Sequence, residues 1–75
     1  MTLDMIKTGE MVEVVDVKCN NYTKKKLSFL GVNRGAELTV IRFAPFNGPV
    51  EIKLLDFYFA LRKEDTKYIM VKKYE

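Results

Sequence analysis

The sequence predicts a mainly β fold, a small five-stranded barrel with one short helix inserted after the first strand, in a single domain over residues 1–75. Three observations support this class. Short runs alternate apolar and polar residues, glycines and prolines separate those runs, and 48% of the chain is apolar. An open sheet of this size would leave two edges that invite aggregation, so we expect the sheet to close.

The first strand is expected at residues 11–17, a segment rich in valine. Val12 and Val14 share one face of this strand, whereas Val15 and Val17 share the other. The change of face predicts a β-bulge near Val14 and Val15, where the strand bends around the barrel.

A short helix is expected next. An asparagine within residues 19–21 can cap its start. Thr23, Leu27 and Leu30 recur at helical spacing and form one apolar stripe about two turns long. Gly31 then adopts a left-handed conformation at little cost, which ends the helix.

The second strand is expected at residues 37–43, and its apolar positions change face between Val40 and Ile41. This repeats the pattern of the first strand and predicts a second bend. Pro45 and Pro49 lack a backbone donor, so they bound the strands on either side of a turn.

Residues 50–61 alternate as a hairpin, with Phe57 and Phe59 expected in the core. Residues 63–66 form a polar connection that can make one helical turn. Residues 68–71 return as the last strand, with two aliphatic side chains directed inward.

A series of short motifs spans nearly the whole chain and resembles the FeoA family. The motifs are Leu27-x-x-Leu30-Gly31, Gly35, Ala44-Pro45, Pro49 and Ala60-Leu61-Arg62. Departures from the family pattern are Arg34 for proline, Asn47-Gly48 for Gly-Asp, Asp56 for glycine, and Asp65-Thr66 for Glu-Ala. The resemblance implies an SH3-like barrel that assists a FeoB-type ferrous iron transporter.

The composition argues against catalysis and against a tight metal site. The chain has no histidine, which removes the commonest general base at neutral pH and a principal iron ligand. Cys19 is the single cysteine and has no histidine to activate it, so its simplest interpretation is a half-buried strand-end residue. We therefore expect no catalytic residues, no metal ligands and no bound cofactor.

The expected location is the cytoplasm. The N-terminal segment lacks the uninterrupted apolar run of a signal peptide, and no segment approaches the roughly 20 apolar residues of a membrane span. A lone thiol also fits a reducing compartment. No membrane insertion is expected, although peripheral proximity to the inner membrane fits the resemblance.

The basic residues are locally clustered, although the net charge is only +3. The run Lys24–Lys26 has three interpretations: a solvated helix face, a contact with an acidic protein or anionic lipid surface, or a nucleic-acid contact. Phe46, at the tip of the prolyl turn, either folds back over the barrel mouth or is offered to a partner.

The sequence therefore predicts an adaptor rather than an enzyme. By resemblance, its partner is the cytoplasmic GTP-binding region of a FeoB-like transporter. The candidate contact surface consists of Lys24, Lys25, Phe29, Asn33, Arg34, Ala44, Pro45, Phe46 and Asn47.

Two alternatives remain open at this point. One is a basic SH3-like module that binds nucleic acid or the ribosome, which the modest net charge disfavours. The other is a stand-alone homologue of the ligand-sensing domain of iron-dependent regulators. No helix-turn-helix precedes the expected barrel, so this chain could not regulate transcription alone.

Overall fold

The structure is a computed structural model that describes residues 1–74. Its elements are η1 (Leu3–Met5), β1 (Met11–Val17), α1 (Asn21–Phe29), β2 (Glu37–Phe43), β3 (Val50–Leu54), β4 (Phe57–Leu61), α2 (Lys63–Thr66) and β5 (Ile69–Lys73). The predicted class is confirmed, with five short strands and one helix between the first two.

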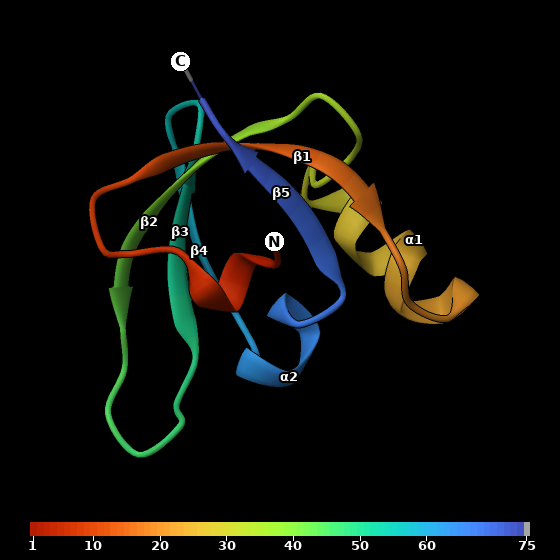
Figure 1. Ribbon diagram of the computed structural model, residues 1–75. Coiled ribbons are helices and arrows are strands. Elements are labelled where there is room, and N and C mark those ends of the chain that lie inside the picture. The colour runs from red at the N-terminus through yellow and green to blue at the C-terminus, as the bar shows by residue number, and fades with distance from the viewer. Residues whose placement is uncertain (75) are drawn as a thin grey trace.

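The five strands form one antiparallel sheet in the order β4-β3-β2-β1-β5. β2 is its central strand, and Leu38 lies opposite Val12 of β1 on one side and Leu54 of β3 on the other. The sheet is strongly curled, as Figure 1 shows. Strands that are adjacent in the sheet are also consecutive in the sequence, with one exception. The exception is the pair β1 and β5, the first and last strands of the chain.

Both predicted bends are confirmed as register shifts. The pairing of β1 with β5 shifts between Val14 and Asp16, so Val15 becomes exposed while Val17 returns to the core. The pairing of β2 with β3 shifts between Val40 and Arg42. Bulges of this kind increase local twist, and here they allow a five-stranded sheet to curl within few residues.

The expected closure of the sheet is not completed by strand pairing, because the two end strands, β4 and β5, do not pair with each other within residues 1–74. The N-terminal segment runs along the outer edge of β5, where Thr2 bridges Met70 and the Val71 N–H donates to the Met1 carbonyl at 2.8 Å. η1 packs against both α2 and β5. The N-terminal segment therefore occupies an edge of β5 that would otherwise be open to pairing.

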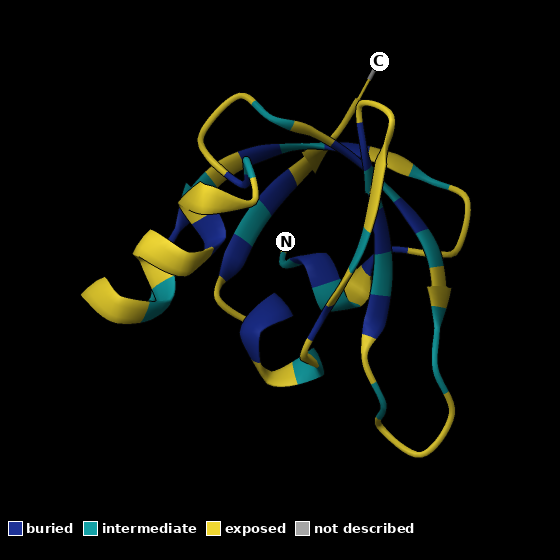
Figure 2. Cartoon of the chain, turned by 180° about the vertical axis from the view of Figure 1, so that it is seen from behind, coloured by how far each residue is buried: buried dark blue, intermediate teal, exposed yellow. Residues whose placement is uncertain are grey.

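The core is aliphatic and lies on the inner face of the curved sheet, which Figure 2 shows in dark blue. Its members are Leu3, Ile6, Val12, Val14, Val17, Leu27, Val32, Leu38, Val40, Val50, Ile52, Leu54, Leu61, Ile69 and Val71. The predicted inward positions of β5 are confirmed by this set. The outer faces of α1 and the turns between strands are exposed.

α1 begins and ends as predicted. The Asn20 side chain accepts a hydrogen bond from the Thr23 N–H at 2.8 Å, which satisfies one of the unpaired donors of the first turn. Gly31, which follows the C-cap residue Leu30, has a φ of +93°. The expected apolar stripe is only partly realised, because Leu27 is buried but Leu30 is 38% exposed. α1 is therefore anchored to the barrel by a single fully buried side chain.

The expectation that Phe57 belongs to the core was wrong. Its side chain is 68% exposed, Phe59 is partly buried, and Leu61 is the one residue of β4 that is buried. Among the described residues, β4 pairs only with β3, and Phe57 lies at its start beside a turn. Alternation predicts which residues share a face, but it does not predict how far the core extends along that face.

Candidate interaction surfaces

The predicted contact residues fall into two groups at different ends of the molecule. Lys24, Lys25 and Asn33 line one depression beside α1, and Lys24, Asn33 and Arg34 line its neighbour. Ala44, Pro45, Phe46 and Asn47 lie in the turn between β2 and β3, away from α1 in both overall views (Figures 1 and 2). The structure thus places the predicted contact residues on two separate surfaces, whereas the sequence analysis assigns them to one.

The corner next to α1 is held by a charge pair. Arg34 and Asp16 lie 3.5 Å apart between Nη2 and Oδ1. The Val17 N–H donates to the Asp16 carboxylate at 2.9 Å, and this hydrogen bond together with Arg34 lowers the pKa of Asp16. Arg34 is therefore engaged within the chain, whereas Phe29 is 94% exposed at the end of the helix.

The prolyl turn (residues 44–49) is a tight hydrogen-bonded structure. The Ala44 N–H donates to the Pro49 carbonyl at 3.0 Å, and the Gly48 N–H donates to the Pro45 carbonyl at 3.1 Å. Between these bonds, Phe46 and Asn47 have φ values of +59° and +58°. Two consecutive positive φ values are the mark of a type I′ turn, a geometry that matches the twist of paired strands.

Phe46 is an unusual residue for this backbone. Asparagine tolerates the left-handed region, but for a bulky side chain the same conformation costs about 1–2 kcal/mol. That cost is not offset by burial, because Phe46 is 99% exposed. The side chain therefore does not fold back over the barrel mouth. An exposed aromatic in a strained turn favours a role in contact with another molecule.

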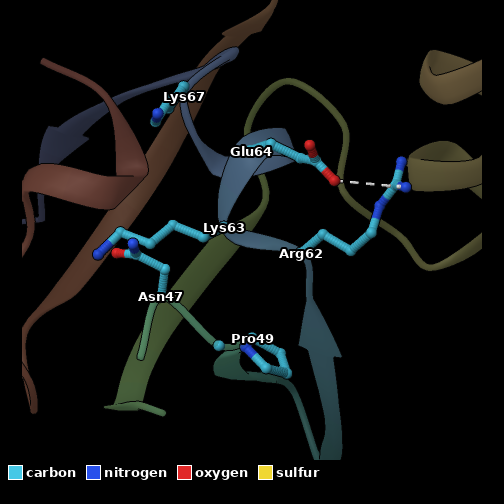
Figure 3. Close-up of a pocket in the computed structure, with 7 residues that line it drawn as sticks. Asn47, Pro49, Arg62, Lys63, Glu64 and Lys67 are labelled. Atoms are coloured by element: carbon cyan, nitrogen blue, oxygen red, sulfur yellow. Dashed lines mark ion pairs between the residues drawn. The ribbon is translucent and has the colours of Figure 1, made fainter. Parts of the chain in front are cut away.

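A basic depression lies beside the prolyl turn. Figure 3 shows Asn47 and Pro49 on one side, and Arg62, Lys63, Glu64 and Lys67 from α2 and its flanks on the other; Gly48 completes the lining. Arg62 and Glu64 form an ion pair at 3.4 Å. Lys63 Nζ lies 5.4 Å from the centre of the Phe43 ring, a cation–π contact. Sequence reasoning did not assign these basic residues to the turn, although the hairpin predicted over residues 50–61 carried the signal, because pairing Val50 with Leu61 places Arg62 beside Pro49.

Leu55 is a second exposed apolar residue in a left-handed conformation, with φ of +55° and 78% exposure. It lies in the turn between β3 and β4, and sequence reasoning missed it. The sequence did contain a signal for its exposure. One strand of the hairpin alternates up to Leu54 and the other from Phe57, so Leu55 belongs to neither set of inward-facing residues.

Cys19 lies in a depression that also includes Asp65 and Tyr68. Burial raises the pKa of the Cys19 thiol, and the Asp65 carboxylate raises it further. We therefore expect Cys19 to react with iodoacetamide several-fold more slowly in the folded protein at pH 7.4 than in urea, where both influences are lost. Equal rates in the two states would contradict this environment.

In residues 1–74, no group of three or more Cys, Asp or Glu side chains is arranged to hold a metal ion.

The fold and its exposed groups together define a class of protein. The molecule is a small curled β-barrel with an aliphatic interior, and its distinctive groups lie on exposed turns and on one helix. The model of the FeoA domain matches residues 1–73, so the chain belongs to the FeoA family. The resemblance drawn from the sequence motifs is confirmed.

Among curated relatives, the chain is 31% identical over 72 residues to the Fe(2+) transport protein A/Fe(2+) transporter FeoB fusion protein of Porphyromonas gingivalis. The match covers 96% of this chain and 8% of the fusion protein. The chain therefore corresponds to a small part of that much longer polypeptide.

Solved structures of the family share the fold. The FeoA protein of Chlorobium tepidum is 33% identical with a TM-score of 0.90, over 97% of this chain and 70% of that one. FeoA of Stenotrophomonas maltophilia, described as a procaryotic SH3 domain protein and solved with zinc, is 25% identical with a TM-score of 0.82, over 96% and 89%. The SH3-like barrel is thereby confirmed. The helices of residues 1–74 are too short to cross a bilayer as apolar spans.

Proposed function

We propose that this protein is a small cytoplasmic adaptor, without catalytic activity of its own, that binds the GTP-binding region of a FeoB-type ferrous iron transporter and supports iron uptake. The observation that carries the proposal is the fusion relative, in which a homologous segment and FeoB form one polypeptide. Fusion holds two modules at high effective concentration, which is useful when the separate chains must bind each other.

The prolyl turn is the part of the surface best suited to this contact. Phe46 supplies an apolar anchor of the kind that dominates protein interfaces, on a rigid hairpin turn that loses little entropy on binding. Lys63 and Lys67 lie in the neighbouring depression and would increase the association rate with an acidic partner surface. The proposed contact does not use the other predicted residues, which lie on or beside α1 at the other end of the barrel: Lys24, Lys25, Phe29, Asn33 and Arg34.

Phe46→Asn tests the turn, because asparagine accepts the same backbone conformation. We expect the variant to be as stable as the parent or up to about 1 kcal/mol more stable. Its affinity for the transporter is expected to fall about 30-fold, the effect of losing a hot-spot aromatic. The measurement is calorimetric titration against the detergent-solubilised transporter and, separately, its isolated GTP-binding region.

Leu55→Asn is the matched control, since it removes another exposed apolar side chain from a left-handed position. It should leave the affinity unchanged. Binding that survives Phe46→Asn would remove the turn from the interface. The adaptor proposal itself would be abandoned if the unaltered protein bound neither form of the transporter, and RNA binding that weakens steeply with salt would then favour the nucleic-acid alternative.

A further inference from the structure

The outer face of α1 carries an aromatic and basic stripe that the adaptor contact does not use. Tyr22, Lys25, Lys26 and Phe29 occur at i, i+3, i+4 and i+7, the spacing of one helix face. All four side chains are exposed, with Tyr22 at 80% and Phe29 at 94%. The single buried residue of the helix, Leu27, faces the barrel. This set of four residues is referred to below as the helix patch.

The charge of the helix patch is not compensated locally. α1 contains no acidic residue, and within residues 1–74 no carboxylate lies within 4.0 Å of the ammonium group of Lys24, Lys25 or Lys26. Arg34, by contrast, is paired with Asp16 at the adjacent corner. These three lysines give the nine-residue helix a local positive charge that attracts anions.

We propose that the helix patch docks the protein on an anionic phospholipid bilayer. Tyr22 and Phe29 are placed to enter the headgroup region, where aromatic side chains are favoured, while Lys25 and Lys26 between them approach lipid phosphates. Lysine is depleted at protein–protein interfaces, so a patch whose centre is two lysines fits a lipid surface better than an acidic protein. The chemistry of this patch is independent of the adaptor function.

The arrangement also leaves the prolyl turn free. α1 and the β2–β3 turn lie at different ends of the barrel (Figure 1), so a bilayer bound along α1 would not cover Phe46. Docking would be shallow, because α1 remains attached to the barrel through Leu27 and its two aromatics are the only apolar groups on the exposed face. Weak, salt-sensitive and reversible binding is the expected behaviour.

Flotation with lipid vesicles tests this proposal. The full chain should float with vesicles of phosphatidylcholine containing one third phosphatidylglycerol at low salt, and should not float with phosphatidylcholine alone. Lys25→Gln/Lys26→Gln should lower the partition coefficient about 30-fold. Lys7→Gln/Lys72→Gln has the same net charge, alters exposed lysines outside α1, and should have a much smaller effect. Tyr22→Ser/Phe29→Ser should also weaken flotation while leaving its salt dependence unchanged.

Three outcomes would overturn the proposal. The parent protein could fail to float with anionic vesicles, or the two double lysine variants could lose binding equally, which would indicate attraction by net charge alone. The helix-patch variants could instead keep vesicle binding but lose affinity for the detergent-solubilised transporter, which would assign the patch to a protein contact. Since the transporter assay contains no bilayer, failure of the adaptor proposal is recognised separately. Circular dichroism of each variant establishes that it is folded.

Discussion

Leu38→Ala is expected to lower the free energy of unfolding by about 2–5 kcal/mol, the range for a fully buried leucine cut to alanine. Leu38 is completely buried in the central strand and lies opposite residues of both neighbouring strands. Its site cannot collapse easily, because Val12 and Leu54 are fixed by the strand ladders on either side. A domain of 75 residues has a total stability of roughly 4–11 kcal/mol, so this loss is a large share of it.

Urea denaturation measures the effect, with an unchanged slope required for a simple comparison. Leu55→Ala is the matched control, since the same atoms are removed from a side chain that is 78% exposed, and it should change stability by about 0.5 kcal/mol or less. If Leu38→Ala is too unstable to measure, Ile52→Val at another fully buried site should cost about 0.5–1.5 kcal/mol. Equal effects of the two leucine substitutions would contradict the position of the core.

Much of the fold could be predicted because period-two patterns record which side of a strand is buried. Near Val15 and Ile41, the apolar residues of the strand change from one face to the other. Both changes correspond to register shifts in the structure. The helix cap and the glycine after α1 followed from residue types that satisfy specific backbone needs. These features depend only on residues that are close in the sequence, so they can be predicted from it directly.

The candidate site was less predictable because it depends on distances between segments. Nothing in the sequence fixes how far α1 lies from the prolyl turn, so Lys24 and Phe46 were assigned to one surface that the fold divides in two. Lys63 and Lys67, in α2 and at its C-terminal end, were also unassigned, although the register of the β3–β4 hairpin pairs Val50 with Leu61 and so places the segment after β4 beside the prolyl turn. The Asn-Gly in the turn indicated positive φ values, but it did not predict that Phe46 would adopt one of them.

Gly31→Ala is the second substitution with a large expected effect, again about 2–5 kcal/mol of unfolding free energy. Two physical causes act together. Gly31 has a φ of +93°, where any side chain is strained, and a Cβ atom there would lie 2.6 Å from Leu54 Cδ2. Leu54 is buried, so its methyl group cannot move aside without disturbing the core between β3 and the end of α1.

Gly35→Ala separates these two causes, because Gly35 has a φ of +86° and a Cβ there would have no atom within 4 Å. That variant should lose only the unfolding free energy due to backbone strain, about 1–2 kcal/mol. The additional loss in Gly31→Ala then measures the steric contact with Leu54. In a double-mutant cycle, Leu54→Ala should therefore cost less in the Gly31→Ala background than alone, since it removes the clashing methyl group. Strict additivity, or equal losses at the two glycines, would mean that the helix end and β3 are not packed as closely as the structure has them.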